Sequence, residues 1–299
     1  MSKLTPDYIC IGAARCATTW VWSLFSKYSE VSLIWPKEIH FFNDNFDRGM
    51  KWYSSHFKDP NRFIRVEVDG VYFADAAAAS SNMKKTCPNV NVFAILRNPF
   101  ERAIDHLVFN YYRDAQTTDI SIENLRSLAT KHKDDKYLKG SCYGSLLLEY
   151  KKSLSAEQVA LFNFEDLQNS PREFAENLLR YVGAGSEYEI TDDMLTPSNS
   201  ARPIRYKFLY KLLRQVKLFS DKNAYCAALI SFFTKKIGAS LIDKLLGPQD
   251  KKDEYPFSIN EAFVELFGSD AVQLIENEME ILEREFDFPV PENWKSLTS

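Results

Sequence analysis

The sequence lacks the cysteine and histidine patterns that hold metals or build disulfide frameworks. Its 299 residues include five cysteines and four histidines. No two cysteines have CxxC spacing, and no metal-ligand spacing relates the histidines, which are His40, His56, His106 and His132. We therefore expect no metal site and no disulfide scaffold, and we interpret each histidine as structural. Such cysteine usage fits a reducing compartment, which predicts a cytoplasmic protein.

Long apolar runs and an excess of one charge are absent too. No window of about 18 residues is apolar and free of charge, so a membrane span is not expected. The first seven residues lack the apolar core of a signal peptide, and a strand-like run begins at Tyr8. The 37 basic and 41 acidic residues leave a net charge of -4. This balance gives no electrostatic footprint for nucleic acid or for another polyanion.

The near-neutral total hides two segments of opposite charge. Residues 201–250 hold ten basic and three acidic residues, a balance of +7, and 251–299 hold four basic and twelve acidic, a balance of -8. Both have helical patterns, and 206–219 is amphipathic. The simplest interpretation is a solvated helix packed on a sheet. The alternative is a surface that faces a membrane or a lipid.

What the sequence does have is an alternation of strand and helix patterns. Apolar residues make up 45% of the chain, enough for a large core. Apolar runs predict strands over 8–13, 90–96 and 158–164, the segment 65–72 is a candidate for a further strand, and helical patterns cover 18–28, 99–113 and 171–181. The last helix has a capping box from Ser170 to Glu173, proline at its first position and Gly183 as its stop. Alternating strands and helices predict βαβ units around a parallel sheet.

The first strand leads into a loop of small residues that opens a helix, Gly12-Ala13-Ala14-Arg15-Cys16-Ala17-Thr18-Thr19-Trp20. Small side chains let backbone amides approach an oxyanion, and the helix N-terminus adds its positive dipole end. Arg15 adds a full charge, and Thr18 and Thr19 add hydroxyl donors. The segment predicts an anion cradle, although an ordinary tight turn is the alternative. It is not a Walker A loop, because Gly-Lys-Ser/Thr is absent.

Two further segments carry charged residues suited to catalysis. Lys37-Glu38 precedes aromatic residues, which predicts a desolvated, basic carboxylate at the edge of an apolar pocket. A surface ion pair is the alternative. Arg97 stands where the strand over 90–96 ends and a helix begins, the place where ligands bind in open parallel sheets, and an arginine there can hold a phosphate. We expect Glu101 and Arg102 to make structural pairs.

Together these segments resemble the sulfotransferase superfamily, in the branch shared by bacterial and glycosaminoglycan sulfotransferases. That family has an opening loop close to G-x-x-K-x-G-T-T, then P-K-E-x-H-F-F and a strand ending R-N-P-x-E-R-A-x-S. A tyrosine-led helix follows, then a strand ending E-D-L. The chain has Pro36-Lys37-Glu38-Ile39-His40-Phe41-Phe42, Arg97-Asn98-Pro99, a helix led by Tyr143, and Glu165-Asp166-Leu167, in that order.

The resemblance implies a P-loop-like three-layer α/β sandwich and the donor 3'-phosphoadenosine 5'-phosphosulfate (PAPS), with no metal. Glu38 would be the general base, with Arg15 and Lys37 as catalytic cations. Arg97 and position 105 would hold the 3'-phosphate, and the opening loop the 5'-phosphosulfate. The donor-binding set is Gly12, Ala14, Arg15, Cys16, Ala17, Thr18, Thr19, Trp20, Arg97, Asp105, Tyr143 and Arg202.

The chain departs from the family pattern at four places. Arg15 replaces a lysine and cannot donate a proton at ordinary pH. Ala17 replaces a glycine, which predicts a backbone there without positive φ. Asp105 replaces a serine, and its carboxylate would repel a 3'-phosphate unless it pairs with Arg97 or Arg102 or is protonated. The segment 67–72 lacks the lysine of E-K-S-P-x-Y. Cys16, beside Arg15, is either a thiol of lowered pKa or, as we favour, a packed thiol.

We therefore expect a sulfotransferase that acts on a hydroxyl, or an amine, of a small molecule or natural product. A highly sulfated glycan is disfavoured, because the chain lacks the dense basic surface that a polyanion needs. The alternatives are a silent nucleotide-binding protein on the same fold and a P-loop phosphotransferase. We expect one domain over 1–299, with an α/β core over 1–190 and a mainly helical part over 191–299. The sequence indicates neither the acceptor nor the oligomeric state.

Overall fold

The structure is a computed structural model that describes residues 4–57, 59, 62–114, 120–131, 136–185, 189–195 and 255–295. The amphipathic segment over 206–219, and the expectations for 201–250 as a whole, lie outside the described residues.

A parallel sheet of five strands, in the order β2-β3-β1-β4-β5, forms the centre of the fold. Its strands are β1 (Tyr8–Gly12), β2 (Val31–Leu33), β3 (Ile64–Val68), β4 (Asn91–Leu96) and β5 (Val159–Asn163). In the register, Tyr8 pairs with Val66 on one side and with Asn91 on the other. The three predicted strands and the candidate strand over 65–72 are confirmed. Strand β2 was not predicted, since three residues are too few to show a period.

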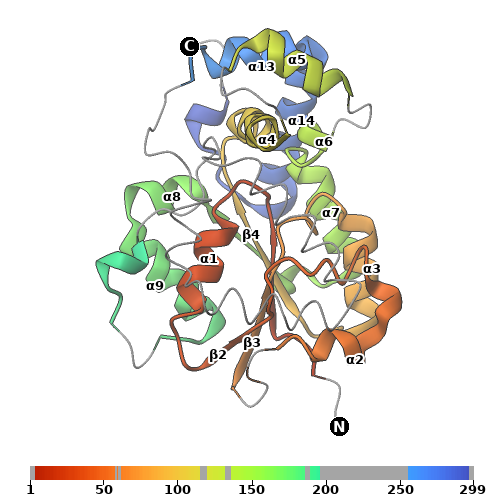
Figure 1. The fold of residues 1–299 in the computed structure, drawn as a ribbon, viewed down its shortest axis with the longest axis vertical. Coiled ribbons are helices and arrows are strands. Elements are labelled where there is room, and N and C mark those ends of the chain that lie inside the picture. Colours follow the sequence, from red (N-terminus) through yellow and green to blue (C-terminus); the bar gives the residue numbers. More distant parts are fainter. Residues whose placement is uncertain are drawn as a thin grey trace.

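Helices cover both faces of this sheet. Figure 1 shows α1 (Thr18–Phe25) and α9 (Pro171–Val182) on one side, and α3 (Ala76–Thr86) and α7 (Tyr143–Ser153) on the other. The short α2 (Gly49–Ser54) and α8 (Phe164–Asn169) complete this part. Phe93 of β4 is fully buried, as expected for a strand covered on both faces, and burial of one such side chain contributes about 1.5–3 kcal/mol.

The start of α9 corrects one expectation and its end confirms another. Ser170 makes no side-chain hydrogen bond to the helix, so the predicted capping box is wrong. Pro171 at the first position lacks an N–H, which leaves one donor fewer to satisfy. Gly183 ends the helix with a left-handed φ of 75°, as predicted. The Glu165-Asp166-Leu167 motif lies in α8, directly after β5, and not at the end of the strand itself.

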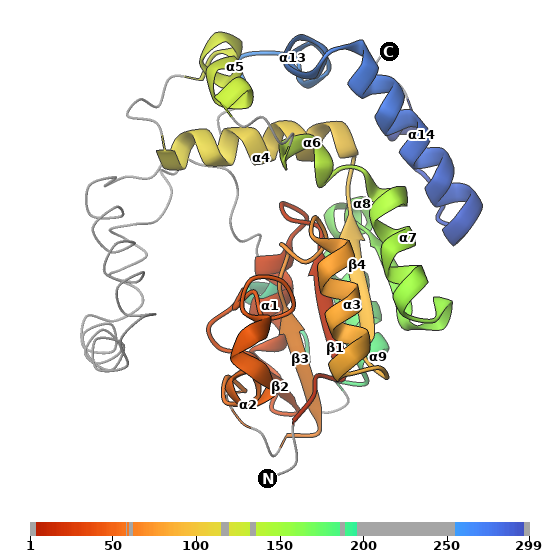
Figure 2. The ribbon, with the colours of Figure 1, turned by 90° about the vertical axis from the view of Figure 1, so that its right-hand side faces the viewer.

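A helical part lies across the carboxyl end of the sheet. Figure 2 shows α4 (Pro99–Asp114) running over the strand ends, with α5 (Ile122–Lys131) and α13 (Ile259–Phe267) beyond it. The short α6 (Lys136–Lys139) leads towards α7, and α14 (Ser269–Phe286) packs along α7. Helices α13 and α14 confirm the helical prediction for part of the acidic segment.

A buried carboxylate joins α14 to the first turn of α7. Glu278 accepts a hydrogen bond from the backbone N–H of Ser145 at 2.6 Å. A carboxylate is favoured at a helix N-terminus, because it satisfies free amides and complements the helix dipole. The C-terminal helix is thereby attached to the helix that follows the candidate site.

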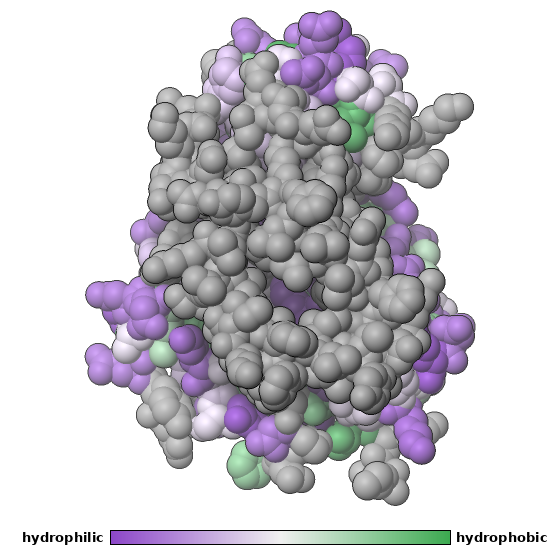
Figure 3. Space-filling model, viewed as in Figure 1, coloured by the Kyte–Doolittle hydropathy of each residue, from purple (hydrophilic) through white to green (hydrophobic). Residues whose placement is uncertain are grey.

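The described helices can be compared with the length and apolar character of a membrane-spanning helix. Among the residues that the structure describes, no helix combines the length and the apolar character that a membrane crossing needs. Figure 3 shows hydrophilic side chains gathered at the upper end of the molecule, over α5 and α13. Cys10, Cys16, Cys87 and Cys142 are not joined by disulfide bonds.

Candidate active site

The sequence-predicted segments meet at the carboxyl ends of four neighbouring strands. The loop 13–17 follows β1, the segment 35–42 follows β2, the turn 69–73 follows β3, and Arg97 follows β4. Ligands bind at this edge in open parallel sheets, because helix N-termini and loops converge there. The fold therefore brings together residues that lie more than 80 positions apart in the sequence.

The loop after β1 has the close approach and the free helix end that an anion cradle needs. Gly12 has a φ of 147°, and a Cβ there would lie 2.7 Å from the Cβ of Phe73, so only glycine fits. Helix α1 begins without a side-chain cap, and the amides of a helix N-terminus are groups that bind anions. Ala17 has a φ of 60°, so the prediction of a backbone without positive φ is wrong. The alanine keeps the left-handed conformation at an energetic cost.

Two loop side chains are buried and contribute packing. The indole of Trp20 packs against Phe174 of α9, with ring centroids 5.9 Å apart. Burial raises the pKa of Cys16 to about 11, against the opposing effect of nearby Arg97. The alternative of a thiol with a lowered pKa is therefore wrong, and the packed thiol is what the structure shows.

Arg15 turns from the loop towards helix α4. Its Nε donates to Oδ2 of Asp105 at 2.7 Å, and its guanidinium stacks over the ring of Phe109 at 4.4 Å. The other carboxylate oxygen, Oδ1, accepts a hydrogen bond from Tyr255 Oη at 2.8 Å. Burial of Asp105 raises its pKa, but the charges of Arg15 and Arg97 outweigh this, and the net pKa is lowered. Asp105 is thus an ionised group held between two arginines.

Arg97 is buried at the end of β4 and is held by carboxylates. Its NH2 donates to Glu101 at 2.7 Å, and its NH1 lies 3.9 Å from Asp105. Its Nε is buried and has no hydrogen-bond partner among the described residues. Burial lowers the pKa of Arg97, but Asp105 and Glu101 raise it by more, so the side chain is charged. An unsatisfied buried donor on a cation is what an anionic ligand would complete.

Two neighbours of Arg97 have structural roles. Tyr143 is buried, and its hydroxyl donates to the backbone carbonyl of Arg97 at 3.0 Å. This hydrogen bond therefore fixes the backbone of Arg97. Arg102 is fully buried, donates from Nε to Ser141 Oγ at 2.7 Å, and also donates to the carbonyl of Tyr137. Among the residues that the structure describes, Arg102 forms no salt bridge to Asp105.

Lys37 joins the carboxylate of Glu38 to the loop. Its ammonium forms an ion pair with Glu38 and lies 3.4 Å from Oγ1 of Thr18, the first residue of α1. The Glu38 side chain is 38% exposed. The prediction of a desolvated carboxylate is therefore wrong, since water reaches the group. The Lys37 side chain therefore contacts both the Glu38 carboxylate and the first residue of the cradle helix.

A buried acidic network, which the sequence analysis missed, fixes the segment that carries Glu38. Asp69 accepts a hydrogen bond from the backbone N–H of His40 at 2.9 Å, and its carboxylate lies 3.0 Å from His40 Nδ1. Burial lowers the pKa of His40, but the hydrogen bond and charge of Asp69 outweigh this and raise it. The backbone of both Glu38 and His40 has positive φ. Asp69 thus holds a strained segment in place.

The second member of the network is Glu67 on β3. Tyr53 and Tyr72 each donate a hydroxyl hydrogen bond to its carboxylate at 2.7 Å, and the Tyr72 oxygen accepts from the backbone of Phe41 at 2.8 Å. Complete burial, with the charge of Asp69, raises the pKa of Glu67 to about 8. The only sequence signal for this network was the E-K-S-P-x-Y position, where the lysine is missing.

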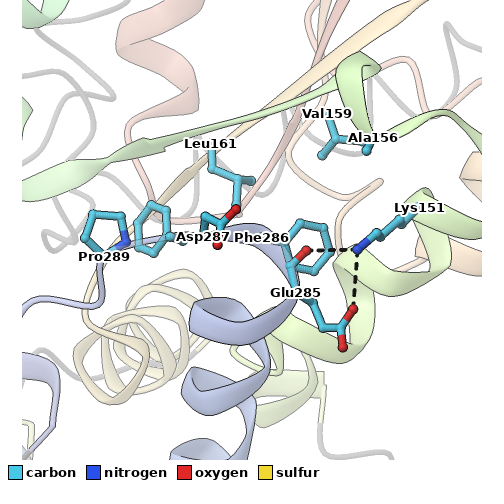
Figure 4. A pocket seen from close by; sticks show the side chains of 9 residues that line it. Lys151, Ala156, Val159, Leu161, Glu285, Phe286, Asp287 and Pro289 are labelled. Atoms are coloured by element: carbon cyan, nitrogen blue, oxygen red, sulfur yellow. Dashed lines mark hydrogen bonds and ion pairs between the residues drawn. The ribbon is translucent and has the colours of Figure 1, made fainter.

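Three further features concern Arg202, metal binding and a hollow away from the candidate site. Arg202 lies outside the described residues, so its predicted contact with a donor stays a prediction. Within the described ranges no three His, Cys, Asp or Glu side chains gather as a metal site would require. A hollow of about 330 Å³ lies beside Val159, at the start of β5, near the Lys151–Glu285 ion pair (Figure 4). Its lining residues Val159 and Leu161 belong to the edge strand β5, which β4 separates from β1 and the cradle.

Comparisons with known proteins agree on one family. The family model described as the sulfotransferase domain matches residues 5–202. A curated relative, membrane-associated sulfotransferase kil1 of Dictyostelium discoideum, is 24% identical over 108 residues. That match covers 35% of this chain and 23% of the relative, so the chain spans about a quarter of the length of that protein.

Solved structures of sulfotransferases match this chain, and the first of the two below shows the same fold. A sulfotransferase from Alicyclobacillus acidocaldarius is 19% identical, with a TM-score of 0.50 over 76% of this chain and 96% of that one. Mouse sulfotransferase SULT7A1 complexed with PAP is 12% identical, with a TM-score of 0.41 over 98% of this chain and 88% of that one.

Proposed function

Since this chain belongs to the sulfotransferase domain family, we propose that it transfers a sulfuryl group from PAPS to a hydroxyl, or an amine, of a small molecule. The observation that carries the proposal is the position of Lys37. Its ammonium lies between Glu38 and Thr18 of the cradle, so a candidate base and a candidate anion site share one cation. Group transfer needs a base at one end and charge stabilisation at the other.

The donor fits the residues present. The amides at the start of α1 and the side chain of Thr18 would hold the 5'-phosphosulfate, with backbone contacts from Cys16, Ala17 and Trp20. Arg97 would hold the 3'-phosphate, and its unpartnered Nε supports this role. Arg15 and Asp105 would line the same site, where the carboxylates of Asp105 and of Glu101, which pairs with Arg97, oppose a phosphate.

In the proposed reaction, Glu38 accepts the proton of the acceptor hydroxyl as the acceptor oxygen attacks sulfur in line. A bond forms from that oxygen to sulfur, and the bond from sulfur to the bridging phosphate oxygen breaks. The products are the sulfated acceptor and 3'-phosphoadenosine 5'-phosphate (PAP). Lys37, with Arg15 once it leaves Asp105, would stabilise negative charge on the leaving oxygen.

A second candidate function rests on the Arg15–Asp105 pair. If that pair persists with nucleotide bound, Arg15 cannot reach the leaving oxygen, and the protein would bind nucleotide without transferring sulfate. The hypothesis of a catalytically silent protein predicts nucleotide binding and no turnover. The acceptor as a natural product, and the cytoplasm as the location, stay predictions from the sequence.

Calorimetric titration of the full chain with PAP tests the donor site without an acceptor. We expect saturable binding, weakened about tenfold or more in Arg97→Gln, because a charged hydrogen bond contributes about 1.5–3 kcal/mol. Arg172→Gln is the matched control, since Arg172 forms an exposed ion pair with Asp192 after β5. Absence of PAP binding in the wild type would overturn the proposal.

A further inference from the structure

Two tryptophans form an exposed aromatic surface beside the segment that carries Glu38. Trp35 is 57% exposed, and its ring lies 5.4 Å from that of Trp22, at an interplanar angle of 41°. The backbone N–H of Trp35 donates to His56 at 2.8 Å, and the indole N–H of Trp22 donates to the carbonyl of Ile34 at 3.4 Å. Both residues are therefore held in place, and the exposed part of the Trp35 ring leaves apolar surface open to a ligand.

The register of α1 places this pair next to the candidate base. Thr18 and Trp22 are four residues apart on α1, so they share one face of the helix and lie about 6 Å apart along its axis. Lys37 contacts Thr18, and Trp35 contacts Trp22. The segment from Trp35 to Glu38 thus runs along one face of α1. The tryptophan pair lies about one helical turn from the Lys37 ammonium.

The hollow beside the tryptophans has a polar rim without unpaired charge. It measures about 70 Å³, and Trp22, Trp35, Ser32, Asp59 and Arg62 are among its lining residues. Nε of Arg62 donates to Asp59 at 3.1 Å, so the two charges offset each other. The rim therefore offers hydrogen-bond donors and acceptors to a neutral ligand. A strongly anionic ligand would have to compete with Asp59 for Arg62.

We propose that Trp35 and Trp22 form the acceptor subsite and that it binds a neutral sugar ring. The face of a pyranose presents C–H groups, which carry a small positive charge and pack on the negative face of an indole. Its edge presents hydroxyls, which match the polar rim. One such ring, stacked on Trp35, lies close enough to Glu38 for a hydroxyl of the same or the next sugar to be sulfated. The inference rests on the proposed function for its catalytic part and on the tryptophan pair for its binding part.

Binding of the sugar can be measured without donor and without turnover. Saturation-transfer NMR with methyl β-glucopyranoside and methyl β-galactopyranoside should show transfer to the ring C–H protons from the wild-type protein. Trp35→Ala should remove most of this signal, and Trp35→Phe should restore part of it. Leu274→Ala is the control, because Leu274 is 39% exposed and lies on α14, which packs along α7 on the other face of the sheet from α1. A signal that survives in Trp35→Ala, or no signal in the wild type, would overturn the proposal.

Kinetics then test the same subsite in turnover. With neutral glycosides as acceptors, Trp35→Ala should raise the acceptor KM about tenfold or more, as expected for loss of a buried aromatic contact, and leave kcat within about twofold. The Kd for PAP should not change. If 2-naphthol is sulfated and glycosides are not, the sugar assignment is wrong while the proposed activity stands. If PAP does not bind at all, the proposed function fails, and the NMR result still decides whether Trp35 binds sugar.

Discussion

Asp105 accepts a hydrogen bond from Arg15 at 2.7 Å and lies 3.9 Å from Arg97, so one carboxylate faces both arginines of the proposed donor site. The family pattern has a serine at this position. The aspartate offsets one of the two positive charges before any donor arrives. The charge of Asp105 is therefore expected to weaken donor binding.

Removal of this charge should tighten PAP binding. Asp105→Asn removes the negative charge that faces both guanidiniums, and we expect the Kd for PAP to fall about tenfold, which corresponds to about 1.4 kcal/mol. The Kd for 5'-AMP, which lacks the 3'-phosphate, should change much less. Calorimetry with both nucleotides measures the difference, with Glu265→Gln in an exposed ion pair as control. Equal effects on the two nucleotides would place Asp105 away from the 3'-phosphate.

Loss of the candidate base should separate turnover from binding. Glu38→Gln keeps the shape of the side chain but cannot accept the acceptor's proton. We expect kcat to fall by about a hundredfold or more, the usual contribution of general base catalysis, with the Kd for PAP within about threefold of wild type. Steady-state assays with calorimetry give both quantities. Normal turnover in this variant would exclude Glu38 as the base.

The buried Glu67 should make stability fall as pH rises. Its pKa in the folded protein is raised to about 8 from an ordinary value near 4.5, so the folded state binds the extra proton between these two values. The free energy of unfolding should therefore decrease with rising pH across that window, by up to about 1.4 kcal/mol per pH unit from this group. The raised pKa of His40 acts in the same direction.

Urea unfolding of the wild type and Glu67→Gln at several pH values isolates this contribution. The amide does not titrate, so the pH dependence in the variant should be shallower than in the wild type. Tyr53 and Tyr72 remain in both proteins, and the comparison therefore cancels their effect. Parallel stability curves for the two proteins would show that Glu67 does not titrate in this range.

Asp69 should act by positioning the segment that carries Glu38. In Asp69→Asn one carboxylate oxygen becomes an NH2, which cannot accept from the backbone N–H of His40. We expect a loss of about 1–3 kcal/mol in stability and a fall in kcat, while the Kd for PAP stays near its wild-type value. Asp75→Asn is the control, since Asp75 forms a more exposed contact with Asn43. A change in PAP affinity equal to the change in kcat would contradict a positioning role.

The sequence was informative wherever chemistry follows a long buried strand. The apolar run before Arg97 predicted β4, and the structure places Arg97 directly after that strand, as expected. The pairing of Arg15 with Asp105 could not be predicted in the same way, because it joins a loop to a helix 90 residues later. The contact of Tyr255 with Asp105 spans 150 residues and follows from the packing of the C-terminal segment. Such contacts depend on tertiary structure, which local periodicity does not report.

Local conformation was misjudged where tertiary contacts override residue preference. Alanine disfavours a left-handed backbone, yet Ala17 adopts one, because the loop must turn from β1 into α1 within a few residues. Glu38 was expected to be desolvated, since aromatic residues follow it. Phe41 and Phe42 instead turn into the core, and the carboxylate stays partly exposed.

The central claim is sulfuryl transfer from PAPS, and the most direct test follows the sulfur atom itself. The full chain is incubated with PAPS radiolabelled at sulfur and a set of neutral glycosides, phenols and amines. We predict that label appears on an acceptor in the same amount as PAP is released, and that Glu38→Gln abolishes both. Tight PAP binding without label on any acceptor class would contradict the claim and would favour a silent nucleotide-binding protein.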